Sequence, residues 1–119
     1  MKDNKNWKIV YYHDNQGNEP VYKFIESLDS NAQAKLSNTF DLLVQFGIGL
    51  GLPHVKKVVN FDFWELRILG ADNIRIFYIA SAGRQFILLH GYIKKSQKTD
   101  KKELRTASSR LKEYKQHKT

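Results

Sequence analysis

The feature that most constrains the fold is a succession of three strand-like segments, the first of which alternates apolar and polar residues. Phe63–Leu69 follows the two-residue period of a β-strand, and Ile74–Ala80 and Gln85–Ile93 are predicted to be the next two strands. Only short segments rich in turn residues, 70–73 and 81–84, separate them. Because connections this short join antiparallel neighbours, the sequence predicts a three-stranded antiparallel meander.

A further strand and a short helix are predicted before the meander. Residues 7–12 are rich in β-branched and aromatic side chains, so we expect an N-terminal strand that adds to the sheet. Apolar residues at helical spacing follow Pro20, which is well tolerated in the first turn of a helix. These residues are Val21, Phe24, Ile25 and Leu28.

A second helix is predicted to follow at once and to form a helical hairpin with the first. Ser30 and Gln33 have the spacing of a capping box, with Ser30 as the N-cap. The predicted buried stripe is Leu36, Phe40, Leu43 and Val44. Glycines from residue 47 onward, followed by Pro53, predict its end.

A basic helix is predicted to close the chain. Residues 94–99 are too polar for a core strand, and Thr99 is the expected N-cap. Its sparse apolar stripe consists of Leu104, Ala107, Leu111 and Tyr114. The predicted class is therefore α+β, with an N-terminal strand, a two-helix hairpin, a three-stranded antiparallel meander and a C-terminal helix in a single domain, residues 1–119.

Length and composition exclude several functional classes. A chain of 119 residues has room for one domain and none for a separate cofactor domain. The absence of cysteine excludes disulfides, thiolate metal sites and cysteine nucleophiles. Carboxylates and histidines are not clustered at metal-site spacing, so neither a metal nor a cofactor is expected. No apolar run approaches the length of a bilayer, so we expect a cytoplasmic protein without a membrane partner.

The positive charge is concentrated at the C-terminal end. Residues 1–90 hold ten Lys and Arg against nine Asp and Glu, whereas residues 91–119 hold ten against three, a surplus of seven of the net +8. Such a segment indicates a polyanionic partner, either nucleic acid or an acidic protein. The alternative is a solvated helix that is simply rich in lysine.

Polar residues inside the predicted strands indicate where chemistry could take place. Glu65 and Arg67 share the strand face opposite Trp64, Leu66 and Ile68, which predicts one polar and one buried sheet face. Arg75 joins them if the intervening turn has an odd number of residues. A two-residue hairpin at 82–83 would place residue 75 opposite residue 90, and so His90 beside Arg75.

Such a cluster suits a phosphodiester. Guanidinium groups bind phosphate through two hydrogen bonds and stabilise the charge that develops as phosphorus becomes five-coordinate. RNA supplies its own nucleophile, the 2′-hydroxyl. Structural alternatives stay open for each residue: an exposed Glu65–Arg67 charge pair, an outward-facing Arg75, a hydrogen-bonded interior His90, and a solvated lysine cluster at 94–98.

Three segments together resemble the signature of the phage-derived HigB-like toxins in the RelE superfamily. They are FWELRI at 63–68, NIRIFY at 73–78 and LHGYIKKSQKT at 89–99. The order of elements also fits, over roughly residues 7–114. The resemblance implies a RelE-like fold and an endoribonuclease that cuts messenger RNA in the ribosomal decoding site, by 2′-hydroxyl attack and without a metal ion.

The resemblance also implies roles for individual residues. Arg67 would contact phosphate and Arg75 would stabilise the transition state, while Glu65 is the available carboxylate base. Lys94, Lys95 and Lys98 would hold RNA or protonate the leaving 5′ oxygen. The predicted catalytic residues are thus Glu65, Arg67, Arg75, Lys94 and Lys95, and the predicted RNA-binding residues are Lys98, His90, Lys101 and Lys102.

One departure concerns the general acid and base. Several members of the superfamily place a tyrosine or histidine near the chain end in that role. The candidates here, Tyr114 and His117, lie outside the three segments.

The resemblance implies partners as well. They are messenger RNA, the ribosome and a cognate, HigA-like antitoxin with a helix-turn-helix domain, with operator DNA bound only through the antitoxin. Two alternatives are a non-catalytic RNA- or ribosome-binding module and a protein whose basic surface binds an acidic partner.

Overall fold

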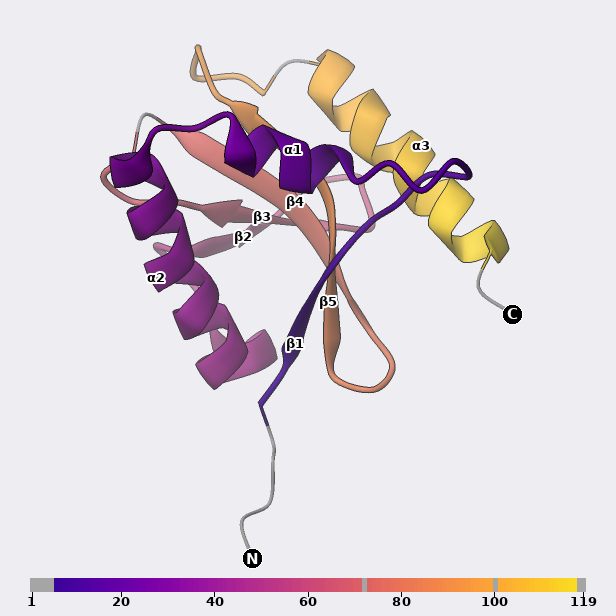
Figure 1. Ribbon diagram of the computed structural model, residues 1–119, viewed down its shortest axis with the longest axis horizontal. Coiled ribbons are helices and arrows are strands. Elements are labelled where there is room, and N and C mark those ends of the chain that lie inside the picture. Colours follow the sequence, from indigo (N-terminus) through magenta and orange to yellow (C-terminus); the bar gives the residue numbers. More distant parts are fainter. Residues whose placement is uncertain (1–5, 72, 100, 118–119) are drawn as a thin grey trace, which may run out of the picture.

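The computed structural model describes residues 6–71, 73–99 and 101–117, which form five strands, three α-helices and one 3₁₀ turn. In chain order these are β1 (Lys8–Tyr11), α1 (Pro20–Glu26), α2 (Ser30–Phe46), η1 (Gly47–Gly49), β2 (Val55–Lys57), β3 (Trp64–Arg67), β4 (Ile74–Ser81), β5 (Gln85–Ile93) and α3 (Lys101–His117). Figure 1 shows the strands joined in one sheet, in the order β1-β5-β4-β3-β2. The α+β class and the predicted order of elements are confirmed.

The strand count of the meander was predicted incorrectly. β3, β4 and β5 are antiparallel neighbours as expected, but β2 extends the meander to four strands by pairing with β3. β1 adds to the opposite edge, parallel to β5. β2 escaped prediction because it has only three residues, of which Lys56 and Lys57 are exposed. So short a strand shows no alternation and is recognised only through its partner.

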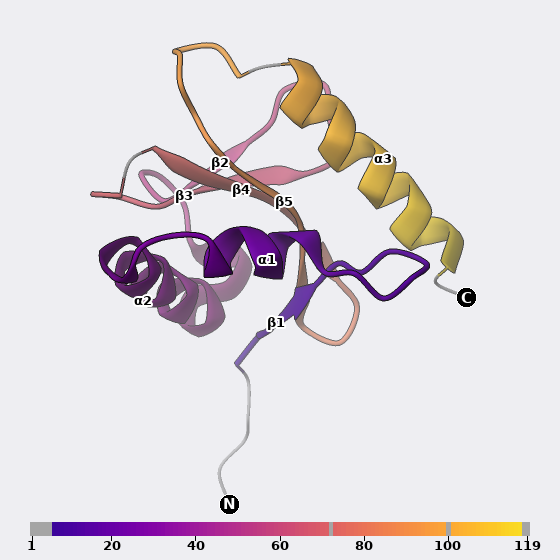
Figure 2. The same cartoon turned by 45° about the horizontal axis from the view of Figure 1, so that its top comes forward.

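Both faces of the sheet are covered, which corrects the prediction of one buried and one polar face. Figure 2 shows α1 and α2 on one side of the sheet and α3 on the other. Leu66, Ile76 and Leu88 belong to the core beneath α1 and α2. Phe77 and Leu89 belong to a second core, which α3 completes.

The start of α2 also differs from its prediction. Asp29, and not Ser30, is the N-cap: its backbone is extended, with ψ at 167°, and its carboxylate accepts from the Ala32 N–H at 2.8 Å. The Gln33 side chain donates instead to the Ile25 carbonyl at 2.8 Å, and so ties α2 to the end of α1. The end of α2 was predicted correctly, because Gly47 follows it with φ at 61°.

The apolar stripe of α3 is confirmed. Ala107 and Leu111 are buried against the sheet, and Leu104 and Tyr114 pack around them. The predicted N-cap at Thr99 stays a prediction, because residue 100 lies outside the described residues. No helix in the described part of the chain is both long and apolar enough to cross a membrane.

Trp64 is the exception among the predicted core residues of the meander. Its side chain is 41% exposed, and the Lys57 ammonium lies 5.9 Å from its ring centroid. Trp64 pairs with Tyr78 and Lys57 near one end of the sheet. The alternation correctly placed Trp64 on the face of Leu66, but an adjacent helix is also needed to bury it.

The register of the β4–β5 hairpin differs from the two-residue turn that we predicted. The loop has three residues, because Ser81 pairs with Gln85, and its last two, Gly83 and Arg84, have positive φ. A bulge follows between the Phe77 and Tyr78 pairs. These two one-residue shifts place Tyr92 opposite Arg75 and leave His90 opposite Phe77, so the predicted Arg75–His90 pair is wrong.

Candidate functional site

The strand register brings the two predicted arginines together. Arg67 lies directly opposite Arg75, and Arg75 lies directly opposite Tyr92. Residues directly opposite in antiparallel strands project from the same face of the sheet. The row Arg67–Arg75–Tyr92 therefore crosses three strands on the α3 face, and the predicted neighbourhood of the arginines is confirmed.

Glu65 connects this row. One carboxylate oxygen, Oε1, accepts from the Nε–H of Arg67 at 3.3 Å and lies 3.8 Å from Nε of Arg75. The other, Oε2, accepts from the Tyr92 hydroxyl at 3.2 Å. Glu65 is 5% exposed, so it is not the solvated charge pair of the alternative reading. A buried carboxylate with these partners fixes the position of both guanidinium groups.

The two guanidinium groups stay within reach of a ligand. The Arg67 side chain is 26% exposed and the Arg75 side chain 15%. Nε of Arg75 is buried and makes no hydrogen bond with the described residues, while its Nη1 donates to the Ile74 carbonyl at 3.3 Å. The guanidinium donors that Glu65 leaves unsatisfied are available to an incoming phosphate.

Tyr92 is the hydrogen-bond donor that completes the Glu65 environment. Burial raises the pKa of Tyr92, a hydrogen bond with the Thr99 side chain lowers it, and the Glu65 charge raises it again. Burial dominates, so the hydroxyl stays protonated and donates to Glu65. Thr99, at the end of the loop before α3, thereby joins the network.

Three adjoining hollows surround this network. The arginine hollow, about 340 Å³, is lined by Pro53, Arg67, Ile68, Leu69, Gly70, Ala71, Asn73 and Arg75. The loop hollow, about 420 Å³, is lined by Asn73, Arg75, Lys94, Lys95, Ser96 and Gln97. The β2 hollow, about 260 Å³, is lined by Lys56, Lys57, Val58, Val59, Glu65, Lys94, Lys98, Thr99 and Leu104.

Shared lining residues show that the three hollows are neighbours, and together we call them the cationic trough. Asn73 and Arg75 line both the arginine hollow and the loop hollow, and Lys94 lines both the loop hollow and the β2 hollow. The trough contains six of the predicted site residues: Glu65, Arg67, Arg75, Lys94, Lys95 and Lys98. The convergence that the sequence suggested is therefore present.

Three predicted RNA-binding residues, His90, Lys101 and Lys102, line none of these hollows. Lys101 and Lys102 are exposed at the start of α3. His90 is partly buried between β5 and α3, with its side chain 14% exposed. Their RNA-binding role stays a prediction, and for His90 the surroundings match the alternative of a hydrogen-bonded interior histidine.

The His90 imidazole links α3 to the sheet through hydrogen bonds. Arg110 donates from Nη1 both to His90 Nδ1 at 3.1 Å and to the Leu89 carbonyl at 3.0 Å. Because Nδ1 accepts, the proton lies on Nε2, which donates to Glu103 at 2.6 Å. Burial is the main cause of a lowered His90 pKa; the Arg110 charge adds to it and Glu103 opposes it.

Sequence reasoning missed the contribution of β2. Lys56 lies directly opposite Glu65 and, with Lys57, lines the β2 hollow. Lys57 is already engaged, because its ammonium donates to the Phe61 carbonyl and to the Val58 carbonyl. The only available signal was a lysine pair flanked by valines, which is too short to predict a strand at the meander edge.

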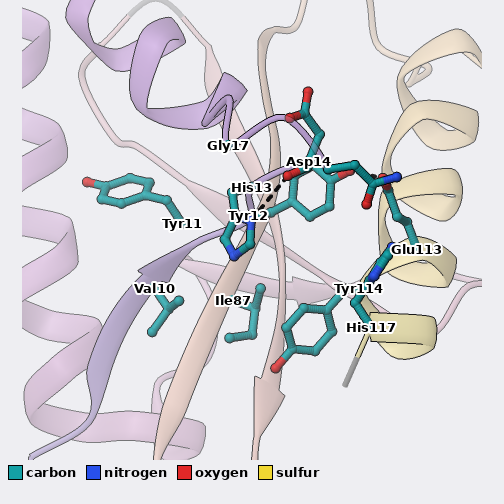
Figure 3. A pocket seen from close by; sticks show the side chains of 11 residues that line it. Val10, Tyr11, Tyr12, His13, Asp14, Gly17, Ile87, Glu113, Tyr114 and His117 are labelled. Carbon is teal, nitrogen blue, oxygen red and sulfur yellow. Dashed lines mark hydrogen bonds between the residues drawn. The ribbon is translucent and has the colours of Figure 1, made fainter. Parts of the chain in front are cut away.

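The C-terminal tyrosine and histidine lie elsewhere. Figure 3 shows Tyr114 and His117, together with His13, around a separate hollow of about 550 Å³ between the end of β1 and the last turns of α3. This hollow shares no lining residue with the cationic trough. Two carboxylates, Asp14 and Glu113, also line it. Tyr114 and His117 are therefore not placed to act at the arginines.

Within the described ranges, no three histidine, aspartate or glutamate side chains are grouped so as to hold a metal ion. The fold and the trough define a small, basic α+β protein whose cations converge on one face of a mixed sheet. A family model with the description "Phage derived protein Gp49-like (DUF891)" matches residues 23–112, and the chain belongs to this family. The family is related to the RelE toxins of toxin–antitoxin systems. No curated protein matches the chain.

Proposed function

We propose that the protein is a HigB-like toxin of a type II toxin–antitoxin system that cuts messenger RNA on the ribosome without a metal ion. The observation that carries the proposal is the pair Arg67–Arg75 on neighbouring strands, with the buried Glu65 between them. Two guanidinium groups held side by side suit one phosphodiester. Membership in a family related to RelE toxins supports the same function.

The proposed reaction uses the RNA as its own nucleophile. The ribose 2′-oxygen attacks the adjacent phosphorus, a 2′-O–P bond forms, and the bond from phosphorus to the 5′ oxygen breaks. The products are a 2′,3′-cyclic phosphate and a free 5′-hydroxyl. Arg67 and Arg75 bind the non-bridging oxygens, and Arg75, the more buried, stabilises the charge that develops on them.

Two proton transfers complete the reaction. Glu65 borders the β2 hollow and accepts the proton of the 2′-hydroxyl. Lys94, which lines two of the three hollows, donates a proton to the departing 5′ oxygen. Lys95 and Lys98 hold the strand on either side through its phosphates.

The proposal includes the partners of such a toxin. The substrate is messenger RNA in the ribosomal decoding site, which places the protein in the cytoplasm. A cognate antitoxin with a helix-turn-helix domain would neutralise the toxin and carry it to operator DNA. The cationic trough offers the antitoxin a surface for acidic side chains.

The test is induced expression of the full chain in bacteria, followed by mapping of messenger RNA 5′ ends. The wild type should arrest growth and create new ends that depend on translation. Arg75→Ala should reduce cutting by about 10²–10³-fold, as for the loss of one transition-state donor. Arg105→Ala removes an exposed arginine of α3 that lines none of the three hollows, and should cut like the wild type.

Circular dichroism of the purified proteins separates loss of chemistry from loss of folding, because a folded but inactive Arg75→Ala protein supports the proposal. Growth arrest by the wild type without new 5′ ends would reject the nuclease and favour the non-catalytic RNA- or ribosome-binding module.

A further inference from the structure

The β2 hollow combines lysines with apolar walls, whereas the arginine hollow, whose walls are also partly apolar, contains the guanidinium groups proposed to hold the phosphate. Val58, Val59 and Leu104 line the β2 hollow beside the lysines, and Val59 is 72% exposed. A phosphate requires positive charge and hydrogen-bond donors. Apolar side chains in the same hollow can pack against the face of a nucleobase. An unstacked base replaces its lost stacking contacts with contacts to such side chains.

The position of the hollow suits a base next to the bound phosphate. The β2 hollow shares Lys94 with the loop hollow, and the loop hollow shares Arg75 with the arginine hollow. A strand whose scissile phosphate lies at Arg75 therefore reaches the β2 hollow with a neighbouring base. The volume of about 260 Å³ suits one base rather than two.

The polar groups around the hollow are mostly donors. Lys57 is engaged by two carbonyls, but within the described residues the ammonium groups of Lys56, Lys94 and Lys98 have no hydrogen-bond or ion-pair partner. Glu65 is buried and bound to Tyr92 and the arginines. An ammonium group donates three hydrogen bonds and accepts none, so the hollow selects a base edge that carries acceptors.

Guanine has the edge that fits. Its O6 and N7 are adjacent acceptors, whereas adenine places an amino donor beside N7 and uracil places N3–H between its two carbonyls. Cytosine also has two adjacent acceptors, O2 and N3, but its smaller ring covers less of the apolar wall formed by Val58, Val59 and Leu104. From this match we infer that the β2 hollow binds a guanine next to the scissile phosphate, with Lys56 and Lys98 donating to O6 and N7. The inference rests on the proposed nuclease function and adds the base preference that such a nuclease would have.

The test maps the cut sites of the wild type, Lys56→Ala and Lys8→Ala. Lys8 is the matched control, because it is also an exposed lysine on an edge strand, β1, at the opposite edge of the sheet. In the wild type and in Lys8→Ala, guanine should be enriched roughly five- to tenfold at one fixed position beside the cut, the effect of one specific base contact. Lys56→Ala should still cut, with this enrichment lost.

A second measurement identifies the edge of the base, with defined messenger RNAs in a reconstituted translation system. Inosine keeps O6 and N7 and should be cut like guanosine, whereas 7-deazaguanosine lacks N7 and should be cut about fivefold more slowly. Cuts without guanine enrichment, or an enrichment that Lys56→Ala leaves unchanged, would overturn this inference alone. A wild type that makes no cuts would overturn the proposed function and this inference with it.

Discussion

Both faces of the sheet are buried, but the side chains that they bury differ in polarity. Under α1 and α2, the sheet contributes apolar side chains such as Leu66, Ile76 and Leu88. Under α3, Phe77 and Leu89 share the face with Glu65, whose partners are charged or polar. The first face needs only to exclude water, whereas the second also holds polar atoms in fixed directions.

This difference teaches where stability and function lie in the molecule. Apolar packing stabilises without fixing a charge, and substitutions there act through lost burial and cavities. A buried carboxylate costs desolvation free energy, which its hydrogen bonds offset only in the right geometry. The α3 face therefore contributes less to the free energy of unfolding than a fully apolar face would. It holds a rigid cluster of cations at the edge of the solvent. Substitutions on the two faces should consequently separate activity from stability.

The largest effect should come from the charged cluster itself. Glu65→Gln keeps the size of the side chain but removes the charge that holds Arg67 and Arg75. The rate of RNA cutting should fall by about 10²–10⁴-fold, the range for loss of a general base. The measurement is the rate of cutting on purified ribosomes.

The matched control for Glu65→Gln is Glu26→Gln, an exposed glutamate at the end of α1 that should leave the rate unchanged. A folded Glu65→Gln protein that cuts as fast as the wild type would contradict the role of Glu65 as the base.

On the opposite face, Leu43→Ala should act on stability. Leu43 of α2 is fully buried in the core under the helical hairpin. Its truncation should lower the free energy of unfolding by about 2–5 kcal/mol, measured by urea titration. Ile48→Ala, at a side chain that is 77% exposed, should stay within about 0.5 kcal/mol of the wild type. A folded Leu43→Ala protein that cuts RNA at a much reduced rate would break the separation between the two faces.

The α3 face should also respond to pH through His90. Burial lowers the folded-state pKa of His90 below the unfolded value of about 6.5. As pH falls through 6.5, the unfolded chain gains a proton that the folded protein does not, so the free energy of unfolding decreases until the pH reaches the folded pKa. In urea titrations between pH 7.5 and 5, His90→Gln should show a shallower decline than the wild type. Equal slopes would contradict a neutral His90 between Glu103 and Arg110.

The smallest effect should come from the rim of the trough. Lys95 is exposed in the loop hollow, so Lys95→Ala should remove one phosphate contact. Affinity for a single-stranded RNA should fall by a few-fold, and the slope of log K against log salt should shrink by about 0.7. Lys112→Ala, an exposed lysine of α3 that lines none of the three hollows, should leave this slope unchanged. An unchanged slope in Lys95→Ala would place the RNA elsewhere.

Much of the fold was predictable because it depends on local sequence patterns. The alternation in residues 63–69 and the two strand-like segments that follow predicted three strands of the meander, and helical spacing predicted the stripes of α2 and α3. The alternation placed Arg67 on the face of Glu65, but only the register of the β3–β4 pairing brought Arg75 to the same face. The sequence by itself thus determined the order of the predicted elements and the strands that carry the two arginines.

Tertiary structure decided what covers each face and which strands lie beside each other. Glu65 was predicted on a polar face, yet α3 and the Tyr92 hydroxyl bury it. The three-residue loop and the bulge in the β4–β5 pairing moved His90 away from Arg75, and the pairing of β2 brought Lys56 opposite Glu65. A local sequence pattern predicts only which side chains are buried. The partner that removes them from water is set by contacts between residues far apart in the chain, and these form only when the whole sheet and its helices pack together.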